Sequence, residues 1–505
     1  MDRYFALPIV LDSAIRFKVE KPKHNTLLAA LKPDLEFDNP DYINALRYGR
    51  KPYRISEKIR CYDWDRTTRT LSLPRGYWRR FQEHARRLGY VLQVDDRRVE
   101  HPKVSVPSRI ELRDYQEPAV EELLVATQGV LVAPPGAGKT EMTLEVLARI
   151  GEPVLWITHK QDLLVQVRDR AVSRLGLSSK EIGIIGRGEE RIGKWLTIGL
   201  VQTLRRRDLS RWADLWGVVV IDECHHVPAY TFREVVHQLP AKRRYGLTGT
   251  PNRADGLHPM MELYIGPIVH RIEPEVVREA GGTITPRHKT ISTGVRSEVW
   301  DRYEQEVREW EMLCEQLALE GMGDQAPPKP RLPWNELIED LLTNVERNAR
   351  IVHVLAQWAP GHSNLVLTGR VSHAMELRER LAEVNPALKS EIIHHGMGLT
   401  RRHEAVDAMR RGELDILFAV DIPKEGLDIP RLDRIYFTAG GKDPIMIKQS
   451  VGRIQRPHPE KDDALVVDFV DFDIPIMRIH FFQRCKLYRE LGMDVGGSKP
   501  LKQTA

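Results

Sequence analysis

Short runs of consecutive apolar residues alternate with stretches of helical periodicity in two separate blocks of the chain. In the first block the runs are GVLVA (129–133), VLWIT (154–158), LTIGL (196–200) and VVVID (218–222). In the second block they are NLVLT (364–368), DILFA (415–419), RIYFT (434–438) and ALVVD (464–468). Runs that are apolar on both faces are typical of parallel strands buried between helices. The two blocks therefore predict two doubly wound, parallel-sheet α/β domains in tandem.

Charged and proline-rich stretches separate and flank these blocks. Residues 297–321 have the periodicity of a long charged helix, and the proline-rich segment 326–334 prevents its continuation. Residues 69–90 predict a strand, a turn and a basic amphipathic helix. The expected organisation is a small α+β N-terminal domain at 1–107, a first α/β domain at 108–285, a helical insert at 286–344, a second α/β domain at 345–475 and a helical tail at 476–505.

Positive charge is concentrated in the N-terminal part of the chain. Residues 1–110 contain 23 Lys and Arg against 14 Asp and Glu, a balance of +9, whereas the whole chain has a net charge of +5. Such asymmetry predicts contact with a polyanion, although a solvated arginine-rich surface gives the same count. The basic side chains of segment 75–87 are Arg75, Arg79, Arg80, Arg86 and Arg87. At helical spacing, the last four lie opposite an apolar face formed by Trp78, Phe81, Ala85 and Leu88.

Cysteine use and hydropathy predict an intracellular protein without a membrane span. The four cysteines are scattered without a CxxC pair, which disfavours a zinc or iron–sulfur site. No stretch approaches the roughly 18 apolar residues of a membrane helix, and the N-terminus lacks the features of a signal peptide. We therefore expect a cytoplasmic location and a reduced environment.

The segment APPGAGKT (133–140) follows the first apolar run and has the spacing of a phosphate-binding loop, GxxxxGK[ST]. Ala133 replaces the first glycine, which fits the pattern if that position needs a small residue and not a positive φ. Lys139 is expected to reach the β- and γ-phosphates of ATP, and Thr140 to ligate Mg²⁺. The loop residues expected to surround the nucleotide are Pro135, Gly136, Ala137, Gly138, Lys139 and Thr140.

Two adjacent carboxylates follow another apolar run, in VVVIDECHHV (218–227). Ligands bind at the carboxyl ends of parallel strands, which places both carboxylates at the expected phosphate site. Asp222 is expected to hold Mg²⁺, and Glu223 to orient or deprotonate the attacking water. Adjacent histidines on one element do not easily converge on one metal ion, so His225 is expected instead to couple this site to the second domain.

The sequence DECH after a phosphate-binding loop resembles the DEAD/DEAH-box helicases of superfamily 2, which contain two RecA-like domains. Further segments resemble the other motifs of that family, in its order: RDYQ (113–116), THKQDLLVQ (158–166), GLVQTL (199–204), LTGTP (247–251), VLTGR (366–370), AVDIPKEGLDIP (419–430) and QSVGRIQRP (449–457). The resemblance covers about residues 110–470 and implies a nucleic-acid-dependent ATPase that uses ATP and Mg²⁺.

The family motifs imply roles for individual residues. Arg113 and Gln116 match the adenine-recognition element, and Gly426 and Asp428 match nucleotide-contacting positions of motif V. The nucleic-acid contacts that the resemblance implies are Thr203, Thr368 and Arg370.

Motif VI supplies the last catalytic residues that the resemblance implies. Arg456 matches the family's arginine finger and Arg453 its γ-phosphate partner, and both act with Gln449. These residues are spaced by about one helical turn and are expected to share a helix face. Because Arg456 must reach the phosphate-binding loop of the other domain, hydrolysis is expected to require domain closure.

The segment 247–272 resembles the branch that contains XPB and the phage UvsW-type branch-migration helicases, although Arg253-Ala254-Asp255 lacks the central Glu of XPB. The resemblance implies a monomeric phage or prokaryotic motor on forked, branched or duplex DNA. It would act at the nucleoid or in the cytoplasm of a phage-infected host, with the insert gripping the duplex. Two alternatives remain open, an RNA helicase and an ATP-gated nucleic-acid-binding subunit of a defence or restriction assembly.

Overall fold

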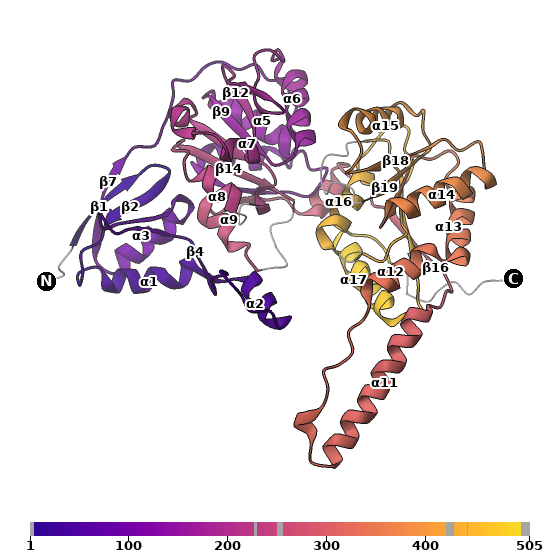
Figure 1. Ribbon diagram of the computed structural model, residues 1–505. Coiled ribbons are helices and arrows are strands. Elements are labelled where there is room, and N and C mark those ends of the chain that lie inside the picture. Colours follow the sequence, from indigo (N-terminus) through magenta and orange to yellow (C-terminus); the bar gives the residue numbers. More distant parts are fainter. Residues whose placement is uncertain (1–4, 227–229, 250–255, 421–428, 442, 496–505) are drawn as a thin grey trace. The chain divides into compact units, whose positions relative to one another are not determined.

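Parallel strands that are buried on both faces form the framework of two structural units, Met1–Ala280 and Gly281–Ala505 (Figure 1). The computed structural model describes residues 5–226, 230–249, 256–420, 429–441 and 443–495. Each unit contains one RecA-like α/β domain, which confirms the fold class predicted from the two blocks of apolar runs. Within the described ranges, no helix has the length and apolar character that crossing a membrane requires.

The first α/β domain has the strand order β11-β10-β12-β9-β13-β14-β8-β15, and only β10 and β11 pair antiparallel. The strands are β8 (Gln128–Val132), β9 (Val154–Thr158), β10 (Gly183–Gly186), β11 (Glu189–Arg191), β12 (Leu196–Leu200), β13 (Val218–Ile221), β14 (Arg243–Thr248) and β15 (Ile268–Arg271). Strands β8, β9, β12 and β13 confirm the four apolar runs of the first block. Along β8, Val130 and Leu131 face different buried clusters, as expected for a strand covered on both faces.

Helices connect these strands. They are α4 (Glu117–Val125), α5 (Lys139–Ile150), α6 (Gln161–Leu175), α7 (Val201–Arg205), α8 (Tyr230–Val236), α9 (Pro259–Tyr264) and α10 (Pro274–Glu279). Helices α5 and α6 each end at a glycine in the left-handed region, Gly151 with φ 75° and Gly176 with φ 65°. The chain can therefore turn sharply back into the next strand of the sheet.

The N-terminal domain is a mixed five-stranded sheet with helices on one face. Its strand order is β5 (Asp63–Asp65), β6 (Thr70–Pro74), β2 (Ala14–Lys18), β1 (Phe5–Leu11) and β7 (Tyr90–Asp96). Helices α1 (Asn25–Leu35) and α3 (Trp78–Arg87) pack together, and a ribbon of β3 (Glu36–Asp38) and β4 (Lys58–Arg60) carries α2 (Pro40–Arg47). Helix α3 confirms the predicted amphipathic helix, because Phe81 and Ala85 are buried and four of its arginines are exposed.

A buried arginine joins the N-terminal sheet to the first α/β domain. Arg75 is 1% exposed, and its guanidinium donates to Oε1 of Gln128 at 3.1 Å and to the carbonyl oxygen of Ala241. Arg75 belongs to the basic segment 75–87, but unlike the four arginines of α3 it lies in the core, where these acceptors bind its Nε–H and Nη1–H groups. Apolar residues of both domains also belong to one buried cluster. The two domains therefore form one structural unit.

The second unit has a fully parallel sheet with the strand order β16-β21-β20-β17-β19-β18. The strands are β16 (Arg287–Ser292), β17 (Asn364–Thr368), β18 (Ser390–His394), β19 (Ile416–Val420), β20 (Arg434–Phe437) and β21 (Leu465–Val470). The main helices are α13 (Val345–Trp358), α14 (Val371–Val384), α15 (Leu399–Arg411), α16 (Pro444–Ile454) and α17 (Pro475–Glu490).

Two of these elements differ from the expected organisation. Strand β16 falls in the segment assigned to the helical insert, yet it pairs with β21 at the edge of the second sheet. Helix α17 falls in the segment assigned to a tail, but Arg484 on this helix is 1% exposed and donates to Asp468 of β21 at 2.9 Å. A buried ion pair of this kind fastens α17 to the domain core.

The long helix of the insert is confirmed as α11 (Glu298–Leu319), which Figure 1 shows extending away from its own sheet. None of its residues is buried, and it returns through α12 (Trp334–Thr343). The helix contains seven acidic and two basic residues, so its net charge is −5. This charge repels phosphate, which weakens the expectation that the insert grips a duplex.

The shared core of the first unit predicts that adding a methyl group at Gly76 lowers the stability of the chain. A Cβ on Gly76 would meet the backbone oxygens of Glu262 and Leu263, the latter at 2.6 Å. We predict that Gly76→Ala costs about 1–3 kcal/mol, because overpacking forces the backbone to shift. The melting temperature of the full chain measures this. Gly323→Ala is the control, because only the Cα of Ala318 lies near that position, at 4.0 Å. Equal melting temperatures for both variants would contradict the shared core.

Candidate active site

The phosphate-binding loop, residues 133–140, leads from β8 into α5 at the carboxyl edge of the first sheet. Gly136 and Gly138 have φ values of 85° and 81°, a left-handed conformation that favours glycine. Ala133 is fully buried and has no positive φ, so a small residue suffices at this position. Nζ of Lys139 lies 2.9 Å from the carbonyl oxygen of Ala133, which places the ammonium inside the loop.

Gln116 fastens the segment RDYQ to this loop. Its Nε2 donates to the carbonyl oxygen of Ala137 at 2.8 Å, and its Oε1 accepts from the backbone N–H of Arg113 at 2.9 Å. A Cβ on Gly138 would collide with Nε2 of Gln116, so glycine is also required there for space. Gln116 is buried and the side chain of Arg113 is exposed. In this arrangement Gln116 shapes the loop, and Arg113 presents its guanidinium to solvent.

The two carboxylates of DECH follow β13 directly. The backbone N–H of Asp222 donates to the carbonyl oxygen of Ile157 in β9 at 2.9 Å, which continues the ladder of the sheet. Asp222 therefore lies at the same edge as the phosphate-binding loop. Glu223 has a φ of 47°, a conformation that costs about 1–3 kcal/mol and persists only where surrounding contacts hold it. One such contact is the hydrogen bond from its N–H to Oδ1 of Asp222 at 3.0 Å.

His225 joins Glu223 to the end of strand β14. Its Nδ1 lies 3.2 Å from Oε2 of Glu223 and 3.0 Å from Oγ1 of Thr248, and its imidazole is buried. The carbonyl oxygen of Thr248 in turn accepts the backbone N–H of Ala133 at 3.0 Å. These contacts connect the DECH segment, the LTGTP segment and the phosphate-binding loop within the first domain. The sequence did not predict these contacts within the first domain, and the expected coupling of His225 to the second domain stays a prediction.

The chemistry of this edge fits a nucleoside triphosphate with a divalent cation. Left-handed glycines, the N-terminus of α5 and the Lys139 ammonium together favour a polyphosphate. A Cβ on Gly249 would lie 3.4 Å from Nζ of Lys139, so glycine keeps this side of the lysine clear. The hydroxyl of Thr140 and the carboxylate of Asp222 are the oxygen donors that Mg²⁺ prefers.

The expected nucleic-acid contacts stand at strand ends in both domains. Thr203 is half-buried on α7, which follows β12, and Thr368 is the last residue of β17. Oγ1 of Thr368 lies 3.4 Å from the carbonyl oxygen of Arg370. The side chain of Arg370 is 40% exposed and forms an ion pair with Glu339 of α12. Arg370 would have to exchange this carboxylate for a phosphate in order to bind nucleic acid.

Motif VI is only partly helical. Gln449 and Arg453 lie one turn apart on α16, but the helix ends at Ile454, two residues before Arg456. The expectation that all three share one helix face is therefore wrong for Arg456. The physical reason is Pro457, because a residue that precedes proline disfavours helical backbone angles. Arg453 is 6% exposed and Arg456 is half-buried.

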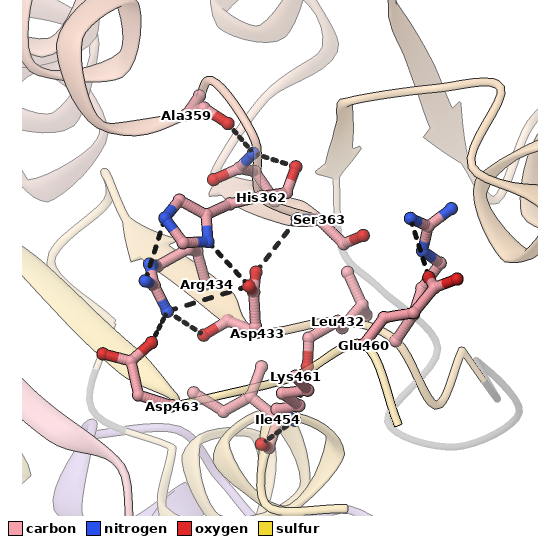
Figure 2. Close-up of polar contacts among 12 residues, drawn as sticks. Ala359, His362, Ser363, Leu432, Asp433, Arg434, Ile454, Glu460, Lys461 and Asp463 are labelled. Atoms are coloured by element: carbon pink, nitrogen blue, oxygen red, sulfur yellow. Dashed lines mark hydrogen bonds and ion pairs between the residues drawn. The ribbon is translucent and has the colours of Figure 1, made fainter. Parts of the chain in front are cut away.

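A buried lysine, Lys461, binds the carbonyl oxygen of Ile454 at the end of α16, two residues before Arg456 (Figure 2). Nζ of Lys461 donates hydrogen bonds to the carbonyl oxygens of Leu432 at 2.7 Å, Ile454, and Arg456 at 3.0 Å. An ammonium has three donors, so these carbonyls use all of them. Burial lowers the pKa of Lys461 to about 8. No sequence motif pointed to this residue.

Charged side chains of both signs surround Lys461 in the same view (Figure 2). Asp433 and Asp463 raise its pKa, whereas Arg456 and Arg434 lower it. Arg434 lies 2.5 Å from Asp463, so these two charges largely satisfy each other. Desolvation by burial is therefore the largest influence on the pKa of Lys461.

Some predicted site residues cannot be placed in this geometry. Gly426 and Asp428 of motif V, and the segment Arg253-Ala254-Asp255, lie outside the described residues.

Comparisons with known proteins agree with the motifs. The family model "Type III restriction enzyme, res subunit" matches residues 109–253, and "Helicase conserved C-terminal domain" matches residues 346–458. Each match covers most of one α/β domain, although β15 lies outside the first match and β16 and β21 lie outside the second.

Curated relatives carry helicase names. The chain is 24% identical to "DNA 3'-5' translocase XPB2" of Sulfurisphaera tokodaii, over 72% of this chain and 82% of the relative. It is 26% identical to "DNA 3'-5' helicase XPB" of Mycobacterium tuberculosis, over 72% of this chain and 61% of the relative. The chain also spans 56% of the length of "Putative DNA 3'-5' helicase Rad25" of Halobacterium salinarum.

Among solved structures, "The crystal structure of T4 UvsW" aligns over 96% of this chain and 98% of that chain, with 18% identity and a TM-score of 0.41. The ordered motifs, the two family matches and the named relatives agree on one family. The chain belongs to the superfamily 2 helicases, the ATP-dependent nucleic-acid motors, in the branch of the XPB-type helicases.

Proposed function

We propose that this chain is an ATP-dependent DNA helicase or translocase that acts on forked, branched or duplex DNA in replication, recombination or repair. The observation that carries the proposal is the contact from Glu223 through His225 to Thr248, which connects the expected hydrolytic carboxylate to motif III. Relatives named as DNA 3'-5' helicases or translocases support DNA as the substrate. A relative from Acanthamoeba polyphaga mimivirus is named a putative ATP-dependent RNA helicase, which keeps RNA as the second candidate.

In the proposed mechanism, Lys139 and the loop N–H groups bind the phosphates of ATP, and Glu223 accepts a proton from the attacking water. Thr140 and Asp222 would hold Mg²⁺, which supplies positive charge against the phosphates when it is bound. His225 keeps the Glu223 carboxylate in place through the 3.2 Å contact. Thr248 belongs to the same network, so a change at the carboxylate also reaches motif III.

The first test compares substrates. We predict that forked DNA stimulates ATP hydrolysis by the full chain more than blunt duplex DNA or RNA of equal length. Lys139→Ala should abolish hydrolysis because phosphate charge is no longer compensated. Glu223→Gln should bind ATP but lose about 10²-fold or more in kcat, because an amide accepts no proton. Glu189→Gln, on exposed β11, is the matched control and should keep the wild-type rate.

Each alternative has its own outcome in that assay. Stimulation by RNA alone would support an RNA helicase. Nucleotide-dependent binding without strand displacement would support an ATP-gated subunit of a defence or restriction assembly. Wild-type turnover by Glu223→Gln would show that another residue acts on the water.

Motif VI gives a second prediction. Arg456→Ala should lower kcat by about 10³-fold, because the guanidinium would stabilise charge on the transferred phosphoryl group. Lys461→Met should lower kcat in the same direction with the KM for ATP unchanged, because it releases the backbone of Arg456. Once Arg456 is replaced, adding Lys461→Met should cost little more, since both changes act through the same group.

The pH profile separates this role from a purely structural one. Above a pH of about 8, Lys461 loses a proton and keeps only two donors. The longest of its three bonds, to the carbonyl oxygen of Arg456 at 3.0 Å, is then the first to be lost. The wild-type kcat should therefore fall as pH rises through about 8, and Lys461→Met should lack this fall. The same fall in Lys461→Met would assign the titration to a different group.

The basic face of α3 is the proposed duplex contact. Arg79, Arg80, Arg86 and Arg87 are exposed on one helix, whereas α11 of the other unit is acidic. Backbone phosphates are bound without reference to base sequence, and their counterions are released to solvent. Binding is therefore proposed to depend on salt and DNA structure and not on DNA sequence.

Replacing these four arginines by Gln tests the contact. We use substitution because deleting the N-terminal domain would expose the core it shares with the first α/β domain. Fork affinity should fall, and the slope of log K against log salt should become shallower by about 0.9 for each phosphate that is no longer neutralised. Basal ATPase should not change. Arg302→Gln with Arg308→Gln, on acidic α11, is the control. An unchanged slope in the α3 variant would contradict the contact.

A further inference from the structure

Residues 39–57 form a projection from the N-terminal domain, which we call the basic-aromatic arm. It contains α2 and the turns that follow, and it stands on the ribbon of β3 and β4. Figure 1 shows α2 at the end of this ribbon, apart from α1 and α3. The backbone N–H of Cys61 donates to the carbonyl oxygen of Leu35 at 2.8 Å, which ties the base of the ribbon to the end of α1.

The arm has a defined conformation although it has no core. Asn39 closes its two ends, because its side chain donates to the carbonyl oxygen of Ser56 at 2.8 Å and accepts from the N–H of Asp41 at 3.1 Å. The backbone N–H of Asn39 also donates to the carbonyl oxygen of Glu57 at 2.9 Å. Hydrogen bonds at the neck, and not buried side chains, therefore hold the arm in shape.

No residue of the arm is buried. Tyr53 is 78% exposed, Tyr48 is 60% exposed and Leu46 is 55% exposed. Such side chains gain little free energy from folding, since more than half of the surface of each remains exposed to water. Several of them gathered on one projection mark a surface that binds another molecule.

The charge of the arm identifies the class of that molecule. The eight residues 47–54, RYGRKPYR, contain four cations, two tyrosines and no acidic residue. The guanidinium of Arg54 lies over the Tyr53 ring, with Cζ 5.3 Å from the ring centroid. Alternation of cations with exposed aromatic rings is the surface that single-stranded nucleic acid requires, because the cations meet phosphates and the rings meet bases.

We propose that the basic-aromatic arm binds single-stranded nucleic acid at the fork, with Tyr48 and Tyr53 stacking on unpaired bases and the neighbouring cations contacting phosphates. This inference rests on the proposed function, because a forked DNA supplies the unpaired bases. The arm differs in chemistry from the basic face of α3, which presents arginines without exposed aromatic rings beside them. The N-terminal domain would thus hold duplex through α3 and a separated strand through the arm.

Other occupants fit this surface less well. The bases of an intact duplex are stacked on one another, so they offer no face to a tyrosine. A protein partner would bury tyrosines equally well, but four cations among eight residues would require it to be strongly acidic at the contact. Single-stranded nucleic acid supplies both the negative charge and the π-faces.

The test measures the affinity of the full chain, without nucleotide, for two fluorescent DNAs. One is a fork with single-stranded ends, and the other is a blunt duplex of the same length. The variant Tyr48→Ala with Tyr53→Ala should bind the fork about 25-fold or more weakly, because removing each of the two stacks weakens binding by about 5-fold or more. Its affinity for the blunt duplex should not change. Its salt slope should also match that of the wild type, because stacking releases no counterions.

Two controls separate stacking from other effects. Tyr48→Phe with Tyr53→Phe keeps the rings and should keep wild-type affinity for the fork. Trp64→Ala removes an exposed ring of β5 outside the arm and should change nothing. In a direct measurement, 5-iodouracil placed in a single-stranded end of the fork should form photo-crosslinks to Tyr48 or Tyr53 in the wild-type chain.

The outcomes also distinguish failure of the arm from failure of the proposed function. If the Tyr48→Ala, Tyr53→Ala variant loses equal affinity for fork and duplex, the proposal for the basic-aromatic arm is overturned. It is also overturned if the variant loses affinity for neither, and that outcome would favour an acidic protein partner. If the wild-type chain binds forks but forks do not stimulate its ATPase, the proposed function fails while the binding comparison still decides the role of the arm.

Discussion

Strand β14 lies between β13 and β8, and this position governs the geometry of the candidate active site. The carboxyl ends of parallel strands meet at one edge, so the last residue of the middle strand adjoins the loops of both neighbours. That residue is Thr248, whose carbonyl oxygen accepts from Ala133 while its hydroxyl contacts His225. Exchange of β14 with another strand would separate the loop of residues 133–140 from the carboxylates of the DECH segment. The strained backbone of Glu223 is held in the same network.

The two α/β domains could be predicted because their central strands are apolar on both faces. Strand β16 could not, because RHKTIS carries polar side chains. An edge strand pairs on one side only and needs less apolar surface, so its sequence lacks the signal that identified the others. The end of α16 could have been predicted from Pro457, which disfavours a helical conformation for Arg456. The spacing of motif VI predicts a shared helix face only if Pro457 is left out of account.

Buried cations are a second kind of feature that sequence reasoning missed. Arg75 and Lys461 belong to residue types that are usually exposed, and nothing near them in the sequence marks them as core residues. Their burial depends on carbonyl oxygens that only the folded chain brings together: Arg75 meets Ala241, and Lys461 meets Leu432. The candidate ATP-site residues could be named from the sequence because they lie in contiguous motifs. Residues such as Lys461, which hold a motif in place, are not part of any motif that can be recognised in the sequence around them.

The join between the N-terminal domain and the first α/β domain has a mechanical consequence. Val99 pairs with Ala241, and the connecting segment is tied down again where the N–H of Val104 donates to Gly151 and that of Arg109 to Arg174. Arg75 is buried at the same join. The N-terminal domain is therefore fixed to the first α/β domain at several points and is not joined to it by a flexible linker alone. A force applied to α3 would therefore be transmitted to the first sheet through these attachments. Under the proposed function, tension on DNA bound at α3 would reach the edge of the sheet that carries Asp222 and Glu223.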